Sequence, residues 1–166
     1  KVLVKNFNMW RQSSEESYID KQTWDLAKID KPNTHKRRVW IGVDVGRVSD
    51  LFAISPMVMM DDYWYLDSFS FVATKYGLTS KEKRDGVSYT NLERQGYCEI
   101  TTLESGVIDD ERVLEKIEEM VYSNDWEVNG ICFDPYQFGT LLTMIEKRHP
   151  EWPLIEVSQT TMVLNM

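Results

Sequence analysis

Two apolar, β-branched runs that each end in an aspartate constrain this chain more than any other feature. Asp44 follows residues 39–43, and Asp134 follows residues 130–133. Such runs predict buried strands, and a strand end holds a carboxylate on a rigid support. If the two strands are neighbours in one sheet, their carboxylates converge at its rim, where they can bind hard divalent cations beside a phosphodiester. A metal-dependent nuclease is therefore the leading hypothesis.

Composition sets limits on this hypothesis. At 166 residues, with 42% hydrophobic and 12% aromatic residues, the chain suits one packed domain with an additional segment at one end. The formal charge of −8 argues against tight autonomous binding to DNA, which needs clustered Lys and Arg. No apolar run approaches membrane-spanning length, so no membrane partner is expected.

The pattern along the chain predicts two parts. Residues 1–38 are interpreted as a connecting arm from a missing upstream domain, and residues 39–166 as the main domain, truncated at its C-terminus. A flexible loop is expected at 74–88. The main domain is expected to contain strands at 39–45, 51–59 and 63–72, a helix at 89–95, a strand at 97–102, a helix at 110–123, a strand at 129–134, a helix at 136–148 and a strand at 154–157.

This element order predicts an α/β fold of the ribonuclease H-like type. An antiparallel three-strand meander is followed by α-β-α-β, which gives a mixed sheet flanked by helices. In that topology the first strand is central and lies beside the strand that follows the first long helix. Asp44 and Asp134 would then be neighbours, although a fold alone does not establish a function.

Each aspartate also has a purely structural interpretation. Asp44 could be an ordinary turn residue, but Gly42 and Gly46 on either side would let ions and backbone approach closely. Asp134 precedes Pro135 and could be the N-cap of the next helix, with proline at the first helical position. Asp50, in the turn to the second strand, is more simply a turn aspartate, with a supporting role behind the metal ligands as the alternative.

Basic residues in the predicted loop are candidates for DNA contact. Lys75, Lys81, Lys83 and Arg84 lie close together in sequence, although charges on a solvated loop would look the same. Neither histidine has a partner at ligand spacing, and no Gly-rich segment ends in Gly-Lys-Ser/Thr. The sequence therefore indicates neither a zinc site nor a phosphate-binding ATPase loop.

Several segments resemble one family. Residues 38–46 followed by 50–53 are similar to the first nuclease motif of the large terminase subunits of tailed bacteriophages, and residues 131–135 resemble the second. Supporting segments are Phe7-Asn8-Met9-Trp10, similar to the part that leaves the family's ATPase domain, and Val157-Ser158-Gln159-Thr160, similar to its late strand.

The resemblance implies the nuclease domain of a viral DNA-packaging motor, an endonuclease that cuts concatemeric double-stranded DNA by two-metal phosphodiester hydrolysis. It implies that Asp44 and Asp134 bind Mg²⁺ or Mn²⁺. It also implies an upstream packaging ATPase domain, the small terminase subunit and the capsid portal as partners, in the cytoplasm of the infected bacterial host.

One departure from the family pattern concerns the metal site. The family uses a third carboxylate downstream of the late strand, and this sequence ends at Met166 before such a position. We therefore expect an incomplete site, with weak or no cutting by the chain as given.

Two other classes of protein stay open. One is a nucleotide-binding half-domain of an actin- or sugar-kinase-like ATPase, whose first strand also ends in Asp-x-Gly; Arg47 and Val48 in place of a Ser/Thr-rich phosphate turn argue against it. The other is a catalytically silent ribonuclease H-like interaction module. Metal binding that depends on Asp44 would separate the nuclease from both.

Overall fold

The computed structural model describes residues 19–158. The chain divides into two compact units, 1–33 and 34–166. In the first unit, helix α2 (Lys21–Leu26) begins after Asp20, whose side chain accepts a hydrogen bond from the Thr23 nitrogen. The supporting segment at residues 7–10 and the Gln159-Thr160 pair lie outside the described residues. The predicted boundary after residue 38 stays a prediction.

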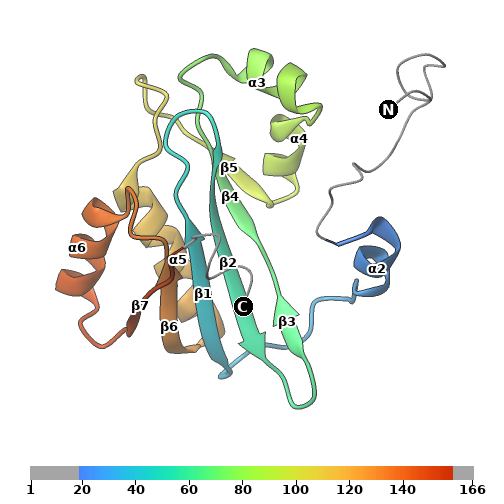
Figure 1. The fold of residues 1–166 in the computed structure, drawn as a ribbon, viewed down its shortest axis with the longest axis vertical. Coiled ribbons are helices and arrows are strands. Elements are labelled where there is room, and N and C mark those ends of the chain that lie inside the picture. The colour runs from blue at the N-terminus through green and yellow to red at the C-terminus, as the bar shows by residue number, and fades with distance from the viewer. Residues whose placement is uncertain (1–18, 159–166) are drawn as a thin grey trace. The chain divides into compact units, whose positions relative to one another are not determined.

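The second unit is built on a mixed seven-stranded sheet (Figure 1). Its hydrogen-bonded order is β5 (Cys98–Ile100), β4 (Phe69–Val72), β2 (Leu51–Met59), β1 (Arg38–Asp44), β6 (Glu127–Phe133) and β7 (Leu154–Glu156), and β3 (Trp64–Leu66) also pairs with β2. Strand β1 is antiparallel to β2 and parallel to β6. The predicted ribonuclease H-like order, with the first strand central and beside the strand after the long helix, is confirmed.

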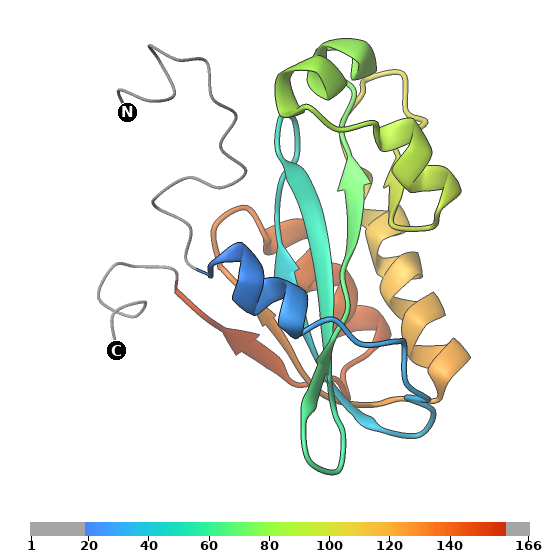
Figure 2. The same cartoon turned by 90° about the vertical axis from the view of Figure 1, so that its right-hand side faces the viewer.

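Alternation along β1 determines which face of the sheet is covered. Val39, Ile41 and Val43 are buried, whereas Trp40, Gly42 and Asp44 project to the opposite face. The buried set packs against helices α5 (Asp110–Asn124) and α6 (Gly139–Arg148), which lie along one face of the sheet (Figures 1 and 2). Asp44 therefore lies on the face opposite these two helices.

The predicted third strand, residues 63–72, is interrupted. The chain forms β3 and β4, which pair with successive parts of β2 on the same side. The Pro56 carbonyl accepts a hydrogen bond from the Asp67 nitrogen on that side, so the missing N–H of Pro56 falls at the same place. Because the ladder lacks a donor there, the two pieces are separated at residues 67 and 68.

Helix α5 (Asp110–Asn124) matches the helix predicted at residues 110–123 to within one residue. Asp109 caps it by accepting a hydrogen bond from the Glu111 nitrogen, and acidic residues at its first turn complement the helix dipole. Its buried side chains are Val113, Leu114, Ile117 and Val121. Burial of these four against the sheet fixes the helix that returns the chain to β6.

The predicted flexible loop at 74–88 is wrong. Helix α3 (Leu78–Asp85) occupies most of it, and α4 (Tyr89–Arg94) follows. Leu78 and Leu92 pack on a small second core formed by Val72, Tyr89 and Cys98. Both helices lie at the end of the sheet where β1 ends (Figure 1). None of the helices within residues 19–158 has the length and apolar character of a membrane span.

Candidate metal-binding site at the sheet rim

The structure brings Asp44 and Asp134 to one rim of the sheet. Val43 and Phe133 are register partners across the parallel β1–β6 ladder, and each aspartate is the next residue of its strand or of the turn that follows it. Both line the same open cavity of about 260 Å³, together with Gly42, Ser55, Cys132 and Val157 among others. The predicted juxtaposition of the two carboxylates is therefore present in the fold.

Asp134 does not cap α6. The residue in the N-cap position is Phe138, which makes no side-chain capping bond. Instead, Asp134 Oδ1 accepts a hydrogen bond of 2.8 Å from the Tyr136 nitrogen, which closes a local turn directly after β6. Helix α6 consequently begins at Gly139, three residues later than the predicted start at 136. The turn orients the carboxylate without using it as a helix cap.

Gly46 is required by the backbone of the loop that follows Asp44. A Cβ at this position would lie 2.3 Å from the Leu51 carbonyl oxygen and 2.7 Å from its carbon. Gly42 has room, since a Cβ there would approach the Ser55 oxygen no closer than 3.7 Å. Of the two glycines, Gly46 therefore serves the tight return of the chain into β2, and it need not make space for an ion.

Asp50 lies elsewhere in the same loop. It is exposed and absent from the lining of the rim cavity, and its charge acts on Arg84 of α3 by raising the pKa of that guanidinium, after the larger effect of Asp85. Its predicted supporting role stays a prediction, and its described surroundings are those of a turn residue beside α3.

The four basic residues predicted to contact DNA fall into two groups. Lys75, Lys83 and Arg84 are exposed. Lys81 is 8% exposed, and its Nζ contacts the Ser49 carbonyl oxygen and lies 3.3 Å from Asp85. Arg84 Nη2 also donates to Ser49 at 3.0 Å. Lys81 therefore contributes to the attachment of α3 to the β1–β2 loop, and little of its charge is available to a ligand.

Asp85 contacts three side chains of α3 and α4. Arg84, Tyr89 and Lys81 all contact its carboxylate, and together they lower its pKa, with Arg84 as the largest cause and Tyr89 next. The carboxylate therefore stays ionised and keeps the end of α3 attached to α4.

The donor chemistry at the rim fits a hard divalent cation, because two aspartates supply carboxylate oxygens at the ends of two adjacent strands. Within residues 19–158, however, no group of three or more His, Cys, Asp or Glu side chains is positioned to hold a metal. The described part of the chain thus presents two carboxylates. The predicted third ligand, beyond Met166, stays a prediction.

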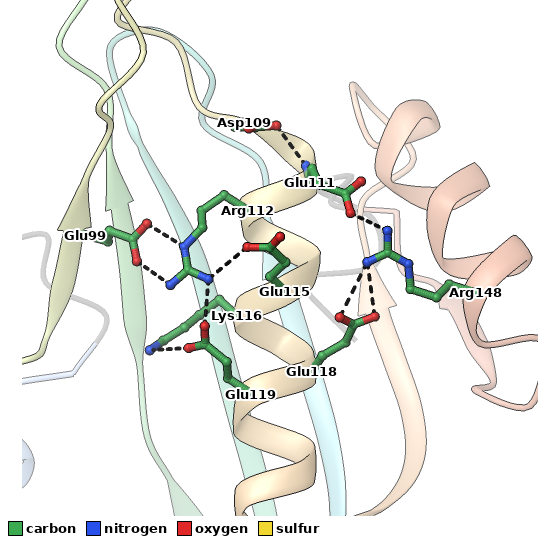
Figure 3. A network of polar contacts seen from close by, with 9 residues as sticks. All are labelled: Glu99, Asp109, Glu111, Arg112, Glu115, Lys116, Glu118, Glu119 and Arg148. Atoms are coloured by element: carbon green, nitrogen blue, oxygen red, sulfur yellow. Dashed lines mark hydrogen bonds and ion pairs between the residues drawn. The ribbon is translucent and has the colours of Figure 1, made fainter.

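The outer face of α5 carries a cluster of acidic side chains that surround Arg112 and Arg148 (Figure 3). Arg112 makes two hydrogen bonds of 2.8 Å to Glu99 of β5 and contacts Glu115 and Glu119 on its own helix. On the neighbouring side, Arg148 of α6 contacts Glu111 and Glu118. This face places several carboxylates around each arginine, so it is a poor surface for a polyanion. The Asp44–Asp134 rim lies on the opposite face of the sheet.

One residue near the rim was not singled out as a site residue from the sequence. The Arg47 guanidinium contacts Asp110 of α5 and the Gln137 carbonyl of the β6–α6 loop. These partners are 63 and 90 positions away, so no local pattern indicates the contacts. From the sequence, Arg47 was used only as evidence against the Ser/Thr-rich phosphate turn of an actin- or sugar-kinase-like ATPase.

Comparisons with known proteins bear on the family and the fold. A family model described as "Terminase large subunit, endonuclease domain" matches residues 1–166. Among solved structures, the large terminase of bacteriophage HK97 is similar, with a TM-score of 0.73 and 22% sequence identity over 88% of this chain. The match spans 29% of the HK97 chain, and at this identity it shows the fold. No curated protein sequence matches the chain.

Proposed function

The chain belongs to the family of terminase large subunit endonuclease domains, and from this premise we propose that it is a Mg²⁺- or Mn²⁺-dependent endonuclease that cuts concatemeric double-stranded viral DNA during packaging. Asp44 and Asp134 are the proposed metal ligands. The single observation that carries this proposal is their position directly after the register partners Val43 and Phe133, at the lining of one cavity.

The two strands would act as a rigid base for the ligands. Asp44 ends β1, a strand that pairs with β2 and β6, and Asp44 itself pairs with Ala53 of β2. Asp134 is oriented by the hydrogen bond from Tyr136. When bound, divalent cations would activate a water molecule and neutralise charge on the scissile phosphate. The chain's own contribution is to hold two carboxylates at a defined separation.

The rim is also the side on which DNA is proposed to approach. The face beyond α5 carries the clustered glutamates, whereas Lys75, Lys83 and Arg84 are exposed at the end of the sheet where β1 ends. A net charge of −8 makes affinity for DNA from this domain alone weak. We therefore propose that an upstream packaging ATPase domain, the small terminase subunit and the capsid portal keep the DNA in place, in the cytoplasm of the infected bacterium.

The test uses the complete large subunit that carries this domain. Wild type, Asp44→Asn and Asp134→Asn are compared by Mn²⁺ calorimetry and by plasmid nicking in Mn²⁺, with Asp62→Asn as the matched control. Asp62 is an exposed aspartate in the turn between β2 and β3, at the other end of β2 from the residues that pair with Asp44. We expect loss of nicking and weaker Mn²⁺ binding in the two rim variants, with no change in Asp62→Asn.

Two results would contradict the proposal in different ways. Normal nicking by either rim variant would show that the catalytic site lies elsewhere. A wild-type protein that neither binds Mn²⁺ nor nicks DNA would indicate the catalytically silent interaction module instead.

A further inference from the structure

Two loops begin at the proposed metal ligands. Residues 45–50 follow Asp44 and connect β1 to β2, whereas residues 134–138 connect β6 to α6. The parallel ladder pairs the two strands up to Val43 and Phe133; Asp44 still pairs with Ala53 of β2, whereas Asp134 lies in the loop after β6. The position of the Asp134 carboxylate relative to Asp44 therefore depends on what holds the β6–α6 loop.

Arg47 connects the β6–α6 loop to the loop that follows Asp44. Its Nη2 donates a hydrogen bond of 2.8 Å to the Gln137 carbonyl oxygen, and its Nη1 donates one of 3.0 Å to Asp110 Oδ2. The main-chain oxygen of Arg47 accepts from the Ile108 nitrogen at 3.4 Å. One residue of the first loop thus contacts the second loop and the segment that starts α5.

Asp110 is a firm support for the guanidinium. Its side chain is 11% exposed, and it lies in the first turn of α5, a helix anchored in the core. Among the described residues, the other oxygen of Asp110, Oδ1, is buried without a hydrogen-bond partner. Arg47 therefore supplies the charge that compensates a largely buried carboxylate, and a bond to an ionised partner at low exposure resists displacement.

The Gln137 carbonyl, which accepts the hydrogen bond from Arg47, belongs to a residue with an uncommon backbone conformation. Gln137 has φ of +63°, the left-handed region that is uncommon for residues other than glycine. The preceding turn is closed by Asp134 itself through the Tyr136 nitrogen. The five-residue loop is consequently held at one end by the proposed ligand and near the other end by Arg47.

We propose that Arg47 is a positioning residue that sets the Asp134 carboxylate relative to Asp44 by bridging the two loops to Asp110. The inference rests on the proposed metal-dependent function, since its consequence is the geometry of the cation site. Its two-donor geometry is the essential property. The guanidinium presents two fixed donors, Nη1 to Asp110 and Nη2 to the Gln137 carbonyl, whereas the single nitrogen of a lysine ammonium lacks this fork.

The experiment compares Arg47→Ala and Arg47→Lys in the complete large subunit, with Arg112→Ala as control. Arg112 also joins two elements, α5 and β5, by paired hydrogen bonds, but it lies on the glutamate-rich face. Hydrogen exchange by mass spectrometry follows the peptide that covers residues 134–138, and calorimetry gives the Mn²⁺ dissociation constant. Thermal unfolding reports stability separately.

We expect exchange in residues 134–138 to accelerate about tenfold in Arg47→Ala and Arg47→Lys, and to be unchanged in Arg112→Ala. The Mn²⁺ dissociation constant is expected to rise about tenfold in both Arg47 variants. If Arg47 had only a structural role, as Arg112 does, all three variants would unfold at a lower temperature. The Mn²⁺ affinity would then show no change specific to the Arg47 variants. Arg47→Lys is the informative variant because it retains the charge.

Either of two results would overturn the inference: unchanged exchange in Arg47→Ala, or full recovery of exchange and Mn²⁺ affinity in Arg47→Lys. The exchange measurement needs no metal, so it decides whether Arg47 bridges the loops even if the wild-type protein binds no Mn²⁺. A wild-type protein that binds no Mn²⁺ would overturn the proposed function itself. The two failures are therefore distinguishable.

Discussion

Asp134 Oδ1 accepts a hydrogen bond of 2.8 Å from the main-chain nitrogen of Tyr136. The carboxylate proposed to bind a cation thus also closes the turn that follows β6. A substitution at Asp134 can disturb two properties, the ligand set and the turn, and different replacements separate them.

We expect Asp134→Ala to lower the free energy of unfolding by about 1 kcal/mol, because it leaves the Tyr136 nitrogen without its side-chain acceptor. Asp134→Asn retains an oxygen acceptor and should stay within about 0.5 kcal/mol of wild type, while nicking is lost. Urea denaturation measures the first effect and plasmid nicking the second. Equal stability of the alanine and wild-type proteins would show that the turn does not need this bond.

A second prediction concerns the glycines beside Asp44. Gly46→Ala would place a Cβ 2.3 Å from the Leu51 oxygen, a main-chain atom that cannot move aside without shifting the loop. We expect a loss of about 1–3 kcal/mol in urea denaturation. Gly42→Ala is the control, since its Cβ would make ordinary contact with Ser55, and it is expected to gain about 0.5 kcal/mol. A Gly46→Ala protein as stable as Gly42→Ala would contradict this account.

The strands and helices with strong patterns were predictable from the sequence. The β-branched alternation of β1 and the spacing of Val113, Ile117 and Val121 in α5 reflect burial of one face, and both elements are confirmed. The pairing of β1 with β6 followed from element order. Local patterns and fold topology were thus sufficient to bring Asp44 and Asp134 together.

Helix α3 was missed for a physical reason. Its sequence from Leu78 to Asp85 is almost entirely polar, so no apolar period indicates a helix. It is held by contacts that polar residues make over long sequence distances, such as Lys81 and Arg84 to the Ser49 carbonyl. The Arg47 contacts escape sequence reasoning in the same way. In each case a charged side chain binds a main-chain oxygen or a distant acid, and composition does not encode that pairing.

A third prediction separates the basic residues near α3. Lys75→Ala and Lys83→Ala should each weaken DNA binding and reduce the slope of log affinity against log salt by about 1, if these exposed side chains contact phosphates. Lys81→Met should leave that slope unchanged, because the Lys81 ammonium is buried against Ser49 and Asp85. Fluorescence anisotropy over a range of salt concentrations makes the comparison in the complete large subunit.

Lys81→Met is expected instead to lower the unfolding midpoint by about 5 °C, since the β1–β2 loop loses a contact to α3. A Lys81→Met protein with normal stability and a reduced salt slope would reverse the assignment. Unchanged salt slopes for both Lys75→Ala and Lys83→Ala would remove the predicted DNA contact from this region.

The last prediction concerns alkaline pH. Burial, together with the hydrogen bond from its hydroxyl to Asp85 and the negative charge of Asp85, raises the pKa of Tyr89 to about 12. The protonated phenol is thus favoured in the folded state, and its contribution to stability is complete below about pH 10, the ordinary pKa of tyrosine. As the pH rises toward 12, this contribution is lost.

Denaturation across this range should show stability falling more steeply in wild type than in Tyr89→Phe. Tyr122→Phe is the control, because Tyr122 is 64% exposed and should leave the steep fall intact. Ultraviolet difference spectra provide a second measure: Tyr89→Phe should remove a phenol whose pKa is about 12 in the folded protein. An equally steep loss of stability in Tyr89→Phe would show that another group titrates in this window.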